Sequence, residues 1–87
     1  MSKIKYSFEL KKSVIVRFPK GVVNIGEVED YSDINGKVSV TINLKDNLPK
    51  ELLKILTDDP RLISIVGVPS EISKAELVDG SLIIQPS

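Results

Sequence analysis

The sequence contains no histidine, no cysteine and no tryptophan among its 87 residues. Without histidine, the chain lacks the side chain that most often exchanges protons near neutral pH. Without cysteine, it has no thiolate nucleophile, no disulfide framework and none of the usual zinc ligand sets. These absences exclude the commonest catalytic and zinc-binding classes, so we expect neither an enzyme nor a bound cofactor.

Long hydrophobic runs are also absent. The N-terminal residues alternate charged and apolar side chains and lack the apolar block of a signal peptide. The longest nearly apolar stretch, residues 62–69, is much shorter than a membrane span. A chain of this length makes one domain, and we predict a single β-rich domain over residues 1–87 in a soluble, cytoplasmic protein without membrane contact.

The net charge is zero, but the charges are unevenly distributed. Residues 1–21 carry six basic side chains and one acidic one, a net charge of +5, and the remainder carries six basic and eleven acidic ones, a net charge of −5. The acids are densest at residues 27, 29, 30 and 33. This asymmetry predicts either an anionic partner or head-to-tail self-association. The simpler alternative is that the charged residues lie on solvated strand faces and only keep the protein soluble.

A period-two pattern of apolar residues dominates the first 18 positions. Every even position from 4 to 18 except residue 12 is apolar, which indicates one strand over residues 3–18. A tight hairpin at Lys11-Lys12 would place Val14 and Val16 on the wrong face. An unbent strand would reach about 50 Å, whereas a domain of this length is about 30 Å across. We therefore predict a bend at residues 11–13, or an arm that leaves the domain.

Turn and strand signals continue along the chain. Residues 18–21 read as a turn, and residues 22–28 as a strand with a bulge at Gly26, where the apolar parity switches. Residues 37–44 form the clearest strand. A two-residue turn at Asn35-Gly36 would pair its apolar residues with residues 29, 31 and 33, so we predict a longer or bulged loop over residues 29–36.

One helix is predicted over about residues 49–57, with Pro49 in its first turn, Leu52 and Ile55 facing inward, and Asp58-Asp59-Pro60 ending it. Residues 62–68 are apolar on both faces, which favours a central strand. Asp79-Gly80 predicts a hairpin that pairs residue 77 with 82, and residues 70–77 are either a strand or a short helix. The fold class is mainly β (β-rich α+β): a small barrel or sandwich of about six to seven short antiparallel strands, with the helix between strands 3 and 4.

Three patterns could carry chemistry, and each has a simpler interpretation. Residues 27–37 do not fit a calcium-binding EF-hand loop, because Tyr31 and Ile42 would fill the first and last ligand positions. A looser site on Asp30, Asp33 and Asn35 stays open beside a solvated turn. Adjacent carboxylates in a strand point to opposite faces, and the serines have no histidine to act as a base. We predict no metal and no catalytic residue.

The order of elements resembles that of an oligonucleotide/oligosaccharide-binding (OB) barrel, which implies a possible single-strand nucleic-acid ligand. Single-strand binding needs aromatic side chains on which bases stack, and the sequence has only four. Three of them share the alternation that is expected to face the core, which leaves Tyr31 as the one candidate. The composition also resembles that of short accessory proteins of phages and other mobile elements, which would place the chain in a host cytoplasm or a virion. The candidate contacts to an anion or partner are Lys3, Lys5, Lys11, Lys12, Arg17, Lys20 and Tyr31.

The leading hypothesis is a non-enzymatic interaction or structural module that acts through sheet edges, as a homo-oligomer or bound to another protein. Ile and Val make up 21 of the 87 residues, and a short sheet of such residues has edges to cover. The alternative is an OB-like barrel that binds single-stranded nucleic acid through its basic N-terminal strand.

Overall fold

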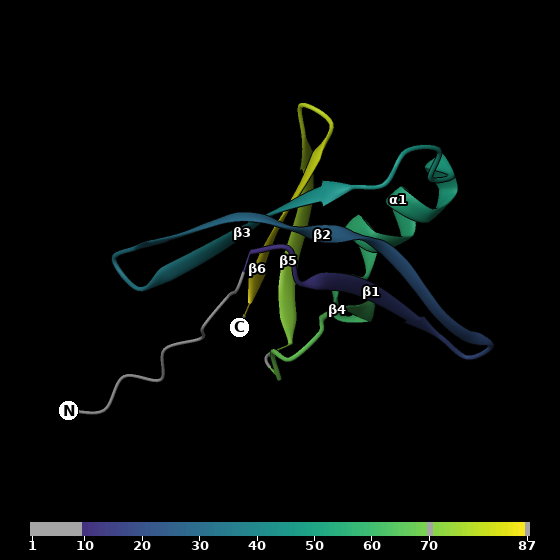
Figure 1. Cartoon of the computed structure of the whole chain (residues 1–87), viewed down its shortest axis with the longest axis horizontal. Helices are drawn as coiled ribbons and strands as arrows, with labels where there is room; N and C mark the ends of the chain where they lie inside the picture. Colours follow the sequence, from purple (N-terminus) through teal and green to yellow (C-terminus); the bar gives the residue numbers. More distant parts are fainter. Residues whose placement is uncertain (1–9, 70, 87) are drawn as a thin grey trace.

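The computed structural model describes residues 10–69 and 71–86, and these form one antiparallel sheet that curls into a half-barrel (Figure 1). The sheet order is β4-β1-β2-β3-β6-β5. The elements are β1 (Ser13–Phe18), β2 (Gly21–Ile34), β3 (Lys37–Leu44), α1 (Lys50–Asp58), a 3₁₀ turn η1 (Pro60–Leu62), β4 (Ile63–Ile65), β5 (Ile72–Val78) and β6 (Ser81–Pro86). The predicted mainly β class, with one helix between the third and fourth strands, is confirmed.

Strand β1 follows a bend, as predicted. Residues 10 and 11 form a turn in which Lys11 adopts a positive φ of 67°. After the turn, Val14 and Val16 are fully buried and Phe18 packs against the core. The even-numbered positions of β1 therefore face the core, and the part of the predicted strand that covers residues 3–9 lies outside the described residues.

Strand β2 starts from the predicted turn at residues 19–20 and contains the predicted bulge. Val14 lies opposite Gly26 and Ile15 opposite Asn24, so one extra β2 residue is left between the two pairs. Gly26 fits there because a Cβ would collide with the backbone carbonyl oxygen of Asn43. The bulge allows both Ile25 and Val28 to be buried.

Of the longer or bulged loop predicted over residues 29–36, the loop is wrong, and the bulge is present within a strand. Strand β2 continues to Ile34, and Asn35-Gly36 makes a two-residue turn with φ values of 54° and 83°. Tyr31 and Asp33 do lie opposite Val40 and Val38, the pairing that the sequence disfavoured. A second bulge between Val28 and Asp30 shifts the register, so Val28 meets Ile42 in the core.

Helix α1 begins after Pro49 and ends where the backbone N–H of Asp59 donates to the carbonyl oxygen of Ile55 at 2.8 Å. Leu56 is its fully buried residue, and Leu52 and Leu53 pack against the core from its side. The expectation that Ile55 faces inward is wrong, because this side chain is 42% exposed. The apolar stripe is wider than the face that the sheet covers.

The apolar segment 62–68 does not form a central strand, which corrects a second prediction. Only Ile63–Ile65 is extended, and this strand lies at the edge of the sheet beside β1. A turn follows it, in which Gly67 has a φ of 85° and the N–H of Val68 donates to the carbonyl oxygen of Ile65. The strand is short because the chain leaves the sheet at this turn.

The C-terminal hairpin has the predicted register. Leu77 lies opposite Leu82 and Ala75 opposite Ile84, across a turn at Asp79-Gly80. The sequence of residues 70–77 allows a strand or a short helix; in the structure, residues 72–77 belong to strand β5, which continues to Val78. No helix among the described residues is long and apolar enough to cross a membrane.

Candidate interaction surface

Strand β2 is paired on both sides only near its middle. Strand β1 pairs with residues 21–27 of β2, and β3 pairs with residues 26–34. Each end of β2 is therefore part of a hairpin, and the two turns lie at opposite ends of the molecule's long axis (Figure 1). We call residues 17–23 the basic hairpin and residues 29–39 the acidic hairpin.

The basic hairpin carries Arg17 and Lys20 and no acidic residue. Arg17 lies directly opposite Val22, so these two side chains share one face. Val22 is 60% exposed and Val23 is 40% exposed, although both are aliphatic. This end of β2 thus presents positive charge beside apolar surface.

The acidic hairpin carries three acids, Glu29, Asp30 and Asp33, against one base, Lys37. Ile34 at its turn is 67% exposed, the highest exposure among the exposed large apolar residues, and Tyr31 is 45% exposed. The carboxylate of Asp33 accepts a hydrogen bond from the N–H of Gly36 at 3.1 Å, which closes the turn. This end of β2 presents negative charge beside apolar surface.

Those of the predicted contact residues that the structure describes do not gather in one groove. Lys11 and Lys12 lie before β1, where the Lys11 N–H donates to the carbonyl oxygen of Val28. Lys20 lies in the turn at the other end of β1, roughly 25 Å away for an extended strand. Tyr31 belongs to the acidic hairpin. Lys3 and Lys5 lie outside the described residues.

The loose calcium site considered on Asp30, Asp33 and Asn35 is not assembled. Asp33 pairs with Val38 and Asp30 with Thr41, and residues an odd number apart in a strand point to opposite faces. Both carboxylates already accept backbone hydrogen bonds, Asp30 from Tyr31 and Asp33 from Gly36. Within the described ranges, no group of three or more acidic side chains is placed to hold a metal ion.

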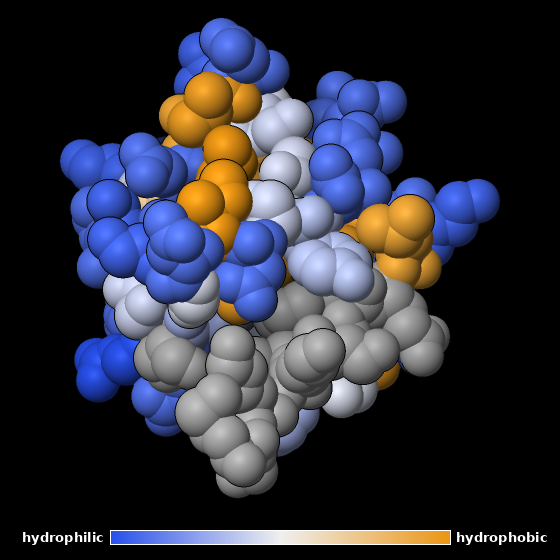
Figure 2. Space-filling view, turned by 90° about the vertical axis from the view of Figure 1, so that its left-hand side faces the viewer, coloured by the Kyte–Doolittle hydropathy of each residue, from blue (hydrophilic) through white to orange (hydrophobic). Residues whose placement is uncertain are grey.

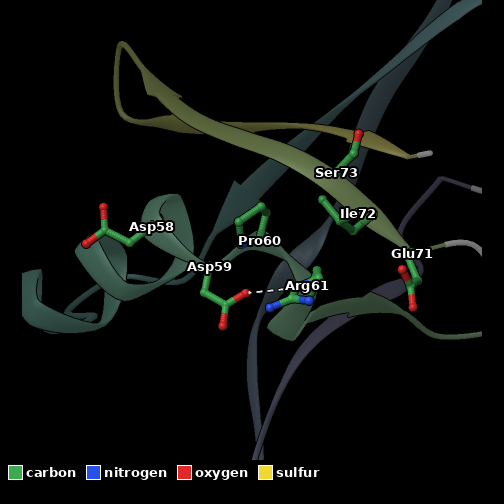
Figure 3. A pocket seen from close by; sticks show the side chains of 7 residues that line it. All are labelled: Asp58, Asp59, Pro60, Arg61, Glu71, Ile72 and Ser73. Atoms are coloured by element: carbon green, nitrogen blue, oxygen red, sulfur yellow. Dashed lines mark hydrogen bonds and ion pairs between the residues drawn. The ribbon is translucent and has the colours of Figure 1, made fainter.

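A shallow hollow of about 580 Å³ lies where η1 meets the start of β5, and the sequence did not indicate it (Figure 3). It is lined by Asp58, Asp59, Pro60, Arg61, Glu71, Ile72 and Ser73. The Arg61 Nε donates to Asp59 Oδ1 at 3.4 Å, and both side chains are well exposed. Figure 3 shows that the three carboxylates do not converge on one point, so the hollow offers no acid pair in position for catalysis.

In the described part of the chain, exposed apolar residues are spread over several elements. Figure 2 shows them in small groups separated by hydrophilic residues on the face that it presents. Besides the two hairpins, exposed apolar side chains occur in the turn before β1, on α1, on the turn after β4 and on β5 (Leu10, Ile55, Val66, Leu77 and Val78). The two hairpins combine apolar exposure with net charges of opposite sign at the two ends of one strand.

Comparison of the chain with models of known protein families, with curated proteins and with solved structures finds no match.

Proposed function

We propose that this protein is a non-enzymatic structural module that associates with itself through exposed edges of its sheet. The observation that carries this proposal is the acidic hairpin. Within the described part of the chain, residues 30–34 of β2 and 37–39 of β3 pair only with each other, because the pairing of β3 with β6 begins at Val40. Unpaired strand edges are ready templates for pairing with another chain.

Side-chain exposure supports the same proposal. Tyr31 and Ile34 are 45% and 67% exposed, so this ribbon presents apolar surface to solvent. Natural sheets blunt their edges with short strands and charges. The three-residue edge strand β4 follows the first pattern, whereas the acidic hairpin carries charges but is long and keeps exposed apolar side chains beside them.

The competing function is binding of single-stranded nucleic acid through the basic N-terminal strand. That function needs a cationic groove with aromatic faces on which bases stack. Lys11 and Lys12 lie at one end of β1 and Lys20 at the other, and Tyr31 lies on a ribbon with a net charge of −2. This placement favours self-association.

The test is thermal unfolding over about a hundredfold range of protein concentration, because association of the folded form raises apparent stability by mass action. We expect Tm to rise with concentration. A titration with a fluorescent single-stranded oligonucleotide at physiological salt runs in parallel, and we expect no binding.

The Lys11→Glu/Lys12→Glu variant separates the two functions. Self-association predicts that its Tm keeps the concentration dependence of the natural chain. A Tm independent of concentration would contradict the proposal. Oligonucleotide binding that falls with salt at a log–log slope of about −0.7 per phosphate contact, and that this variant abolishes, would establish the competing function instead.

A further inference from the structure

The self-association proposed above leaves open which surfaces meet, and the charges on β2 indicate an answer. We propose that the basic hairpin of one copy docks on the acidic hairpin of another. The inference rests on the proposed function and identifies its contact.

The two hairpins carry complementary charges. The basic hairpin carries a net charge of +2 and the acidic hairpin a net charge of −2. Two acidic hairpins, or two basic ones, would bring like charges together, which costs free energy and disfavours pairing of identical ends. Only unlike ends attract each other.

Both hairpins also carry exposed apolar groups that a contact could bury. Val22 on the basic hairpin and Ile34 on the acidic hairpin are 60% and 67% exposed. Burying these side chains against each other would make the free energy of association more favourable through the hydrophobic effect, which salt does not weaken. The ion pairs would add selectivity and a faster encounter.

One molecule cannot make this contact with itself. The two hairpins lie at opposite ends of the 14-residue strand β2, which spans about 43 Å. The longest dimension of the molecule is also 43 Å. A second copy is therefore required. Two copies that exchange the contact form a closed dimer, and copies that pass it along form a chain.

Cross-linking tests the contact directly, because the chain has no cysteine of its own. Val22→Cys and Ile34→Cys are made as separate proteins, mixed in equal amounts and treated with a short bismaleimide. Mass spectrometry tells the products apart because the two variants differ in mass. We expect the mixed Val22–Ile34 product to exceed each homodimer several-fold, and raised salt to reduce it.

The matched control is Val78→Cys, which is 42% exposed and lies on β5, outside both hairpins. Mixed with Ile34→Cys, it should cross-link at the background level. If the Val22–Ile34 mixture links no better than this control while the unlabelled protein still associates, the inference is wrong and the proposed function stands. If the protein does not associate at all, the proposed function fails as well.

Charge reversal gives a second, independent readout. Arg17→Glu/Lys20→Glu and Glu29→Lys/Asp30→Lys should each weaken association about tenfold or more. Asp33 is left in place because it closes the turn. An equal mixture of the two variants should associate again, because each then meets a hairpin of opposite charge. As a control, the reversal Lys50→Glu/Lys54→Glu on α1 should leave the association constant unchanged. If the mixture of the two hairpin variants does not associate, the inference is wrong.

Discussion

The middle of strand β2 and its two ends differ sharply although they belong to one continuous strand. In the middle, Ile25, Gly26 and Val28 are buried between β1 and β3, whereas residues 21–24 and 29–34 are exposed. The middle has a partner strand on each side, and each end has only one. The comparison indicates that the middle specifies the fold and that the ends are available for contacts.

The largest expected effect is at the middle. Ile25→Ala should lower the free energy of unfolding by about 2–5 kcal/mol, because Ile25 is fully buried and its truncation leaves a cavity. Chemical denaturation of the variant and of the natural chain, at one concentration, measures the difference. A loss below about 0.5 kcal/mol, the range of surface substitutions, would show that the middle of β2 does not anchor the core.

Substitution at the Gly26 bulge should lower the free energy of unfolding by an amount in the lower part of the range given for Ile25→Ala. Gly26→Ala should cost about 3 kcal/mol, at the upper end for overpacking, because the new Cβ meets the carbonyl oxygen of Asn43 and not a flexible side chain. Gly36→Ala is the control: it sits in open space with a φ of 83°, so only its backbone conformation is penalised, by about 1 kcal/mol. Equal losses in the two variants, measured by denaturation, would mean that Gly26 is not tightly packed.

The smallest effect is expected at the ends. Val22→Ala and Ile34→Ala should each change the free energy of unfolding of the dilute protein by less than about 0.5 kcal/mol, because both side chains are mostly exposed. The same variants should reduce association in concentrated solution. Denaturation at low concentration and light scattering at high concentration give the two values. A large loss of stability in the dilute protein would show that the ends of β2 contribute to the core, which contradicts the comparison.

Much of the fold follows from local patterns. The alternation that buries Val14 and Val16, the bulge at Gly26 and the Asp79-Gly80 turn are each specified by residues close in sequence. The features that were mispredicted depend on distant parts of the chain. The bulge near Glu29 exists because Val28 has to meet Ile42. Likewise, β4 is an edge strand and Ile55 is exposed because of what packs beside them.

The candidate surface was predictable only in part. The sequence showed a basic first part and an acidic middle, and it indicated head-to-tail association as one consequence. It did not show that one strand carries both charges to opposite ends of the molecule, because residues 29–34 were expected to be a loop. The length of β2 is decided by its pairing with β3.

The most direct test of the account is the mass of the protein in solution, measured by sedimentation equilibrium over about a hundredfold range of concentration. The account predicts that the average mass rises from that of the 9.6 kDa chain toward a multiple of it. It also predicts that added salt moves the rise to higher concentration. A mass that stays at 9.6 kDa at every concentration and at low salt would contradict it.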